Sequence, residues 1–176
     1  MPKSVITIRQ ENSEDFNKVY TVIQKAFAMA EHSDGDEQDL VVRLRKSHAF
    51  IPELSLIAET GNEIVGHIMF TKLKAGNTTQ LCLAPLSVLP QYQNQGIGTM
   101  LIEKGHEAAR KLNYEFSIVI GYPQYYQRFG YEDARHFGFE PPFELPENVF
   151  MACHLQNQPT DKSAKFIEYP KEFFEK

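Results

Sequence analysis

The chain has 176 residues, of which 42% are hydrophobic and 23% are charged, and its formal net charge at pH 7 is −5. A chain of this length can bury one substantial core and is most simply a single domain. The acidic balance and the lack of a long Lys/Arg cluster argue against a nucleic-acid-binding surface. No apolar run approaches the length of a membrane span, and the first residues hold no signal-peptide core. We therefore expect neither nucleic acid nor membrane among the partners.

The first half of the sequence predicts two helices and several strands. In chain order we expect a strand over 5–8, a helix capped by Asn12 or Ser13 and running to Phe27, a second helix with Leu40, Val41 and Leu44 on one side, and strands over 54–58, 64–70 and 80–88 joined by turns at 60–63 and 75–78. Pro85 cannot donate to a strand ladder, so it marks a bulge or the end of a pairing.

The second half predicts a βαβ unit followed by shorter elements. We expect a helix over about 97–112 with Met100, Leu101, Lys104, Ala108 and Leu112 along one side, a buried strand over 116–120, helical turns over 123–128 ending at Gly130, and a strand over 149–155. The strands on either side of the long helix should be parallel. Phe166, Ile167 and Tyr169 are expected to tie the more polar residues 156–176 to the body.

The two cysteines, Cys82 and Cys153, each lie in an apolar run that is typical of a strand. Their spacing fits no metal or redox motif, and the histidines and carboxylates show no metal-binding spacing on one helix. We expect two buried thiols in a reducing cytoplasm and no metal site.

A polar loop with two glycines, Gly96 and Gly98, separates the strand that ends near Pro90 from the long helix. Backbone N–H groups at a helix start have no intrahelical partners and lie at the positive end of the helix dipole. The helix starts at 13–15 and 34–39 carry carboxylates, whereas the first carboxylate after Gly98 is Glu103. The loop therefore predicts an anion site suited to phosphate.

Spacing excludes two common nucleotide sites at this loop. A P-loop needs a Lys-Ser/Thr pair after its last glycine, and none follows Gly98. A dinucleotide fingerprint needs a third glycine at position 101, which is Leu101.

Three motifs occur in order along the chain: residues 86–90 (LSVLP), 93–98 (QNQGIG) and 126–131 (YQRFGY). They resemble the pantetheine-binding strand, the acetyl-CoA signature Q/R-x-x-G-x-G/A and the later Y-x-x-x-G-F element of the GNAT superfamily of N-acetyltransferases, with Tyr131 in place of the usual Phe. Residues 52–56 and 123–126 are similar to the small bacterial acetyltransferases of the YhbS type. The resemblance covers about 5–155, and the remaining tail is similar too.

The resemblance implies the fold and the reaction. The fold would be α/β, with a central, mostly antiparallel twisted sheet, one splayed parallel strand pair and helices on both faces. Residues 1–176 would form a single N-acetyltransferase domain, with a core over about 5–155 and an extension over 156–176 packed on it. Acetyl-CoA would be the cosubstrate, and its acetyl group would pass directly to a primary amine of a small molecule, peptide or protein, without a metal.

The resemblance also implies the site. The pyrophosphate of coenzyme A would lie on backbone N–H groups of residues 93–98, and the pantetheine arm would run beside 86–88 as an extra strand. If the Gln93 amide closes the loop, it orders the site before binding. The implied cofactor-binding residues are Leu86, Ser87, Val88, Gln93, Asn94, Gln95, Gly96, Ile97, Gly98 and Thr99.

Tyr126 resembles the family's general acid for the leaving thiolate. Proton transfer from a tyrosine with a pKa near 10 to a thiolate with a pKa near 8.5 is uphill by roughly 2 kcal/mol. We therefore expect Tyr126 to stabilise the developing thiolate by a hydrogen bond. Full proton transfer would require the nearby Arg128 to lower the tyrosine pKa.

Other roles stay open. The sequence favours none of four candidate bases: Glu31 and His32 in a solvated loop, Glu37 at a helix start, and His67, which we expect on a polar strand face. Phe137, Phe139 and Phe143 are expected to cover the core rather than line a pocket. The acceptor should depend on residues 29–39 and 137–149, and a homodimer is open. The alternative function is a non-catalytic acyl-CoA-binding sensor or interaction module.

Overall fold

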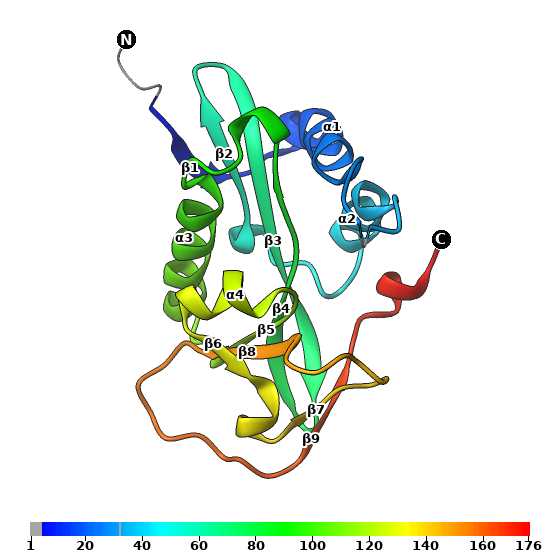
Figure 1. Ribbon diagram of the computed structural model, residues 1–176, viewed down its shortest axis with the longest axis vertical. Helices are drawn as coiled ribbons and strands as arrows, with labels where there is room; N and C mark the ends of the chain where they lie inside the picture. Colours follow the sequence, from blue (N-terminus) through cyan, green and yellow to red (C-terminus); the bar gives the residue numbers. More distant parts are fainter. Residues whose placement is uncertain (1–4, 32) are drawn as a thin grey trace.

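The computed structural model describes residues 5–31 and 33–176, and its centre is a nine-stranded twisted sheet (Figure 1). The strands are β1 (Thr7–Gln10), β2 (Ser55–Thr60), β3 (Glu63–Ala75), β4 (Thr78–Val88), β5 (Phe116–Ile120), β6 (Tyr131–Asp133), β7 (Phe139–Glu140), β8 (Phe150–His154) and β9 (Lys165–Glu168). Their order is β1-β2-β3-β4-β5-β8-β6, and only β4 and β5 pair in parallel along this path. The predicted mixed sheet is confirmed, and a short parallel pair of β7 with β9 adds to it.

Helices cover both faces of this sheet, as expected. Figure 1 shows α1 (Phe16–Phe27) and α2 (Glu37–Arg45) on one side and α3 (Ile97–Lys111) on the other. Asn12 caps a short 3-10 turn before α1, and its side chain accepts a hydrogen bond from the Glu14 N–H. The short helix α4 (Pro123–Tyr126) follows β5, and a second short turn then ends at Gly130. Within the described part of the chain, no helix has the length and apolar character to cross a membrane.

The buried side of α3 differs from the one that the sequence predicted. Of the expected residues only Leu101 is fully buried, while Lys104 and Leu112 are exposed. The residues that the sheet covers are Ile97, Leu101, Ile102, Gly105, His106 and Ala109. A Cβ at Gly105 would overlap the ring of Phe70 on β3, so the missing side chain lets the helix approach the sheet there. Hydropathy alone does not mark a glycine as a contact residue.

The C-terminal segment joins the sheet through β9. β9 pairs antiparallel with the end of β3, where Ala75 lies opposite Ile167. Ile167 is buried, whereas Phe166 is 71% exposed, so the expectation that Phe166 anchors the tail is wrong. Alternate residues of a strand point to opposite faces, and only one face of β9 meets the core. Tyr169 packs against Phe173, with their ring centroids 5.2 Å apart.

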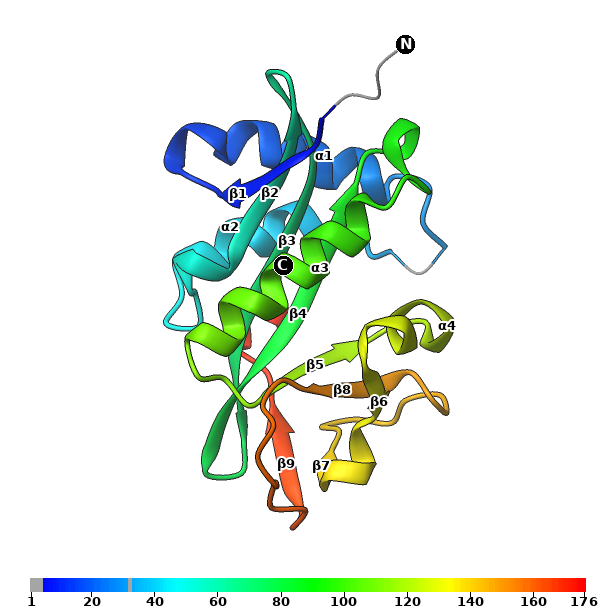
Figure 2. The same cartoon turned by 90° about the vertical axis from the view of Figure 1, so that its left-hand side faces the viewer.

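The parallel pair β4–β5 separates after two residue pairs. Leu81 lies opposite Ser117 and Cys82 opposite Ile118, and no further pairing joins the two strands. On its other edge β4 continues to pair with β3, with two residues of β4, one of them Pro85, facing one residue of β3. This bulge confirms the interpretation of Pro85. Figure 2 shows β5 leading away from β4 toward α4, so the far half of β4 has an unpaired edge.

Candidate active site

A cavity of about 520 Å³ lies where β4 ends and α3 begins. We call it the glycine-loop pocket. Its lining residues are Leu86, Val88, Tyr92, Gln93, Asn94, Gly96, Ile97, Gly98, Thr99, Tyr125 and Arg128. The predicted cofactor-binding residues therefore gather around one cavity, except Ser87 and Gln95. Ser87 is 2% exposed and its hydroxyl is buried, so only its backbone could meet a ligand at the open edge of β4.

Side-chain amides hold the loop of this pocket in shape. Gln93 Nε2 donates to the carbonyl oxygen of Val88 at 3.0 Å, which closes the loop as the sequence analysis anticipated. Gln95 Nε2 donates to the carbonyl oxygen of Gln91 at 3.2 Å. Gly96 has a φ of 84°, a left-handed conformation that glycine adopts without steric cost. The loop is thus ordered by the chain's own contacts.

The backbone N–H groups of residues 94–99 donate to no acceptor within the described part of the chain. The first hydrogen bond into α3 runs from the Met100 N–H to the carbonyl oxygen of Gly96 at 3.1 Å. No acidic residue lies in the first turn of α3. A run of unpaired donors at the positive end of a helix is the arrangement that binds phosphate groups.

Two residues that sequence reasoning did not assign to this pocket, Tyr125 and Arg128, complete its lining. A Cβ at Gly98 would overlap the Tyr125 hydroxyl, so this glycine lets Tyr125 lie against the start of α3. The Arg128 guanidinium lies 4.7 Å from the centroid of the Tyr125 ring, and its Nε donates to the Tyr125 carbonyl oxygen at 3.2 Å. Arg128 therefore adds a positive charge to the lining of the pocket, beside Tyr125. The sequence signal for this contact was the spacing of three residues between Tyr125 and Arg128 in a predicted helical turn, which places the two side chains close together.

Tyr126 lies beside this pocket rather than in its lining. Its ring packs so closely on Gly121 that a Cβ there would overlap it, and its centroid is 5.0 Å from that of Tyr125 and 5.5 Å from that of Tyr131. Burial raises the pKa of Tyr126 well above its usual value, and Tyr125 and Cys82 add to the rise. Arg128 does not counter this rise, because its guanidinium lies over Tyr125 and Phe129. The hypothesis that Arg128 lowers the tyrosine pKa is therefore wrong.

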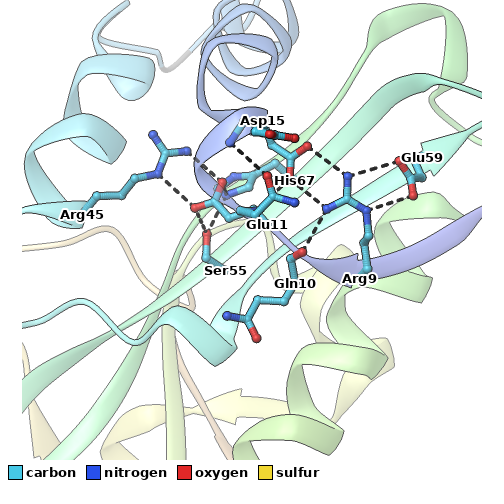
Figure 3. Close-up of polar contacts among 10 residues, drawn as sticks. Arg9, Gln10, Glu11, Asp15, Arg45, Ser55, Glu59 and His67 are labelled. Atoms are coloured by element: carbon cyan, nitrogen blue, oxygen red, sulfur yellow. Dashed lines mark hydrogen bonds and ion pairs between the residues drawn. The ribbon is translucent and has the colours of Figure 1, made fainter.

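His67 is fully buried, so its expected place on a polar strand face is wrong. Figure 3 shows it in a buried network with Glu11, Arg45 and Ser55. His67 Nε2 lies 3.1 Å from Ser55 Oγ, which donates to Glu11 Oε1 at 2.5 Å. Arg45 donates to both carboxylate oxygens of Glu11, at 3.0 and 2.8 Å. None of these residues lines the glycine-loop pocket.

The network joins the turn before α1, helix α2 and strands β2 and β3. Burial lowers the pKa of His67 to about 4, so the imidazole is neutral at pH 7. Burial opposes ionisation of Glu11, but the hydrogen bond from Arg45 and the contacts with His67 and Ser55 hold its pKa below the usual value. The hydrogen bonds among Glu11, Arg45 and Ser55 stabilise the packing of the elements that carry them, whereas His67 Nδ1 has no hydrogen-bond partner among the described residues.

Two of the other candidate bases, Glu31 and Glu37, do not line the glycine-loop pocket. Glu31 is exposed, and Glu37 has one buried carboxylate oxygen without a hydrogen-bond partner in the described chain. His32 lies outside the described residues. Among the described residues, no cluster of three or more His, Cys, Asp or Glu side chains could hold a metal ion.

Proteins of known family resemble this chain in sequence. Residues 52–133 match the family described as Acetyltransferase (GNAT) domain. Uncharacterized N-acetyltransferase YjhQ of Escherichia coli K12 is 32% identical over 159 residues, which cover 88% of this chain and 84% of YjhQ. Uncharacterized N-acetyltransferase YhbS of the same strain is 24% identical over 169 residues, which cover 94% of this chain and 97% of YhbS.

Two solved structures have the same fold. A GNAT family acetyltransferase from Brucella melitensis, solved in complex with acetyl-CoA, matches with a TM-score of 0.80 at 27% identity and covers 97% of this chain and 99% of its own. YhbS from Escherichia coli, solved in complex with CoA, matches with a TM-score of 0.85 at 23% identity over 99% and 95% of the two chains. The chain belongs to the GNAT family of acetyltransferases, as its motifs predicted.

Proposed function

We propose that the protein transfers an acetyl group from acetyl-CoA directly to a primary amine of a small molecule, peptide or protein. The run of unpaired backbone N–H groups at residues 94–99, at a cavity that Arg128 also lines, carries this proposal. Such a run is suited to the pyrophosphate of coenzyme A. The Brucella melitensis relative, solved in complex with acetyl-CoA, supports the choice of donor.

The unpaired edge of β4 suits the pantetheine arm. Leu86 and Val88 line the glycine-loop pocket, and the arm would extend along residues 86–88 toward the bulge at Pro85. Backbone groups on that edge have no partner strand because β5 has turned away. A backbone N–H near the bulge would hydrogen-bond the thioester carbonyl and the oxyanion that forms on attack.

The reaction needs a neutral amine and a leaving thiolate. The amine nitrogen forms a bond to the thioester carbonyl carbon, the carbon–sulfur bond breaks, and the nitrogen gives up a proton to solvent. Tyr126 would donate a hydrogen bond to the departing sulfur. Because burial raises the pKa of Tyr126, proton transfer to a thiolate with a pKa near 8.5 is more uphill than for an ordinary tyrosine. We therefore assign Tyr126 the role of hydrogen-bond donor, with the thiolate taking its proton from water.

Neither cysteine is suited to carry the acetyl group. Burial raises the pKa of Cys82 to about 12 and that of Cys153 to about 11, so both remain thiols at pH 7. A thiol is a poor nucleophile compared with its thiolate. This supports direct transfer over a route through an acyl-cysteine.

Replacing Tyr126 with Phe tests this assignment. We expect kcat to fall about 10- to 100-fold, the equivalent of one hydrogen bond to a charged group, while the Kd for acetyl-CoA changes less than about twofold. Thiol release from acetyl-CoA measures kcat, and calorimetry measures binding. The matched control Tyr114→Phe removes the hydroxyl of a tyrosine that does not line the pocket and should leave both values unchanged. A Tyr126→Phe protein with unchanged kcat would remove the assignment.

The same assay distinguishes the enzyme from a sensor. Acetyl-CoA that binds but releases no thiol with a broad panel of amines, amino acids and peptides would favour a non-catalytic acyl-CoA-binding module. A protein that does not bind acetyl-CoA would contradict both functions. We further propose that the whole chain acts as one domain in the cytoplasm. The pairing of β9 with β3 and the buried free thiols support this proposal.

A further inference from the structure

A second cavity, of about 260 Å³, lies on β4 on the other side of the Pro85 bulge. We call it the aromatic pocket. Its lining residues are Cys82, Leu83, Ala84, Ile120, Phe143, Tyr169, Phe173 and Phe174. Ile120 is the last residue of β5, so this pocket opens where β4 and β5 separate. Tyr126 packs on Gly121, the residue after Ile120, while its neighbour Tyr125 lines the glycine-loop pocket. The proposed position of the reacting sulfur therefore lies between the two cavities.

The walls of the aromatic pocket come from distant parts of the chain. The rings of Phe143 and Tyr169 stack with centroids 6.4 Å apart, and Phe173 meets Tyr169 edge-on. Arg43 of α2 holds the tail in place, since its Nε donates to the carbonyl oxygen of Glu172 at 3.1 Å. The pocket is thus closed by the loop between β7 and β8 and by the C-terminal residues.

No charged side chain lines this pocket. Its only ionisable groups are Cys82 and Tyr169, and burial raises the pKa of both, so both are neutral at pH 7. Ile120, Phe143 and Phe174 are 39%, 44% and 64% exposed. Large apolar side chains gathered around a hollow, with no charge among them, are typical of a site for an apolar ligand group.

We propose that the aromatic pocket is the acceptor subsite and that it takes a primary amine carried on a single aromatic ring or a short branched aliphatic chain. The inference rests on the proposed acetyl transfer and adds the substrate class. A polyamine or a free amino acid would bury a second charge without a partner, which is strongly unfavourable. The volume is slightly below that of pockets for drug-sized ligands, which suits one ring.

The apolar lining also explains how an amine could react in the aromatic pocket without a general base among the lining residues. An ammonium ion that enters a pocket without counter-charges loses hydration, which lowers its pKa and favours the neutral amine. The neutral amine is the form that attacks the thioester. The substrate would therefore arrive as a nucleophile by giving its proton to solvent, and Glu37 and His67 would take no part.

A panel of amines tests the substrate class. Phenethylamine and isoamylamine are compared with spermidine, lysine and glycine by thiol release, and the acetylated amine is identified by mass spectrometry. We expect kcat/KM to be highest for the two apolar amines. Phe143→Ala and Phe174→Ala should each raise the KM for phenethylamine about tenfold through lost apolar contact, with the Kd for acetyl-CoA unchanged. The matched control is Phe166→Ala, which removes an exposed ring outside the pocket and should change neither value.

The outcomes separate this inference from the proposed function. A higher kcat/KM for spermidine or lysine than for phenethylamine would overturn the proposed substrate class and leave the proposed acetyl transfer intact. Variants that keep the KM for phenethylamine but change the preference for hexanoyl-CoA over acetyl-CoA would show that the pocket holds an acyl chain instead. Acetyl-CoA that binds without acetylating any amine would contradict both proposals and favour the sensor.

Discussion

Replacing His67 should change how the stability of the fold depends on pH. In the folded chain burial lowers the pKa of His67 to about 4, from a usual value of 6.5. Between these two pH values the unfolded chain binds a proton that the folded chain does not. Acid therefore favours unfolding, and the stability associated with His67 is lost as the pH falls from about 6.5 to about 4. The difference of 2.5 pH units between these two pKa values corresponds to about 3 kcal/mol.

The magnitude within a practical range follows from the same values. Between pH 7 and pH 4.5 the His67 contribution is about 2 kcal/mol, because the folded imidazole starts to bind its proton near the lower limit. Glu11 acts in the same direction at lower pH, since its pKa is held below the usual value and its protonation weakens the contact with Arg45. We expect His67→Gln to be less stable than the native protein at pH 7 and to lose about 2 kcal/mol less on acidification.

Urea unfolding at pH 7 and pH 4.5 measures the effect. The chain contains no Trp, so far-UV circular dichroism follows the transition. His48→Gln, at an exposed histidine, is the matched control and should keep the native pH dependence. If His67→Gln does not fold, the imidazole of the native protein can be titrated by NMR and should protonate near pH 4. A native pH dependence in His67→Gln, or a titration near pH 6.5, would refute the assignment of a buried neutral imidazole.

Two glycine variants test the close approaches in the fold. Gly98→Ala should displace the Tyr125 hydroxyl into the glycine-loop pocket. We expect the Kd for acetyl-CoA, measured by calorimetry, to rise about tenfold, a loss of about 1.4 kcal/mol of binding free energy, with little change in the midpoint of urea unfolding. An unchanged affinity would show that Tyr125 does not limit the pocket. Gly105→Ala should overlap the ring of Phe70 and lower the free energy of unfolding by about 1–3 kcal/mol, as overpacking does. A stability equal to that of the native protein would mean that α3 shifts away from β3 at no cost.

Local patterns in the sequence predicted most elements of the fold and led to the proposal of a donor site at the glycine loop. Alternating apolar residues and turn signals marked the strands, and Pro85 marked the bulge of β4. The loop at Gly96 and Gly98 was recognisable because its chemistry is carried by the backbone of one short segment. The glycines, the missing carboxylates and the closing amide of Gln93 all lie close together in the chain. The roles of the individual cofactor-binding residues and of Tyr126 remain predictions.

Residues whose surroundings come from distant segments were predicted wrongly. His67 was expected on a polar face, but it is buried in the core, where its Nε2 meets Ser55 and its Nδ1 has no hydrogen-bond partner among the described residues. The three phenylalanines at 137, 139 and 143 divided between two roles: Phe137 and Phe139 are buried, while Phe143 lines the aromatic pocket. The periodicity of a sequence predicts on which face of a strand or helix a side chain lies, but it does not predict which segments pack against that face.

The sequence by itself therefore determined the family, the mixed fold and the loop suited to the coenzyme, because each depends on a short run of neighbouring residues. The tertiary structure decided where the charges and apolar surfaces meet. It placed Arg128 over Tyr125 rather than beside Tyr126, and it brought Phe174 to the end of β5. Residues far apart in the chain become neighbours only when the strands pair and the tail folds back. The proposed acceptor subsite is built from such neighbours.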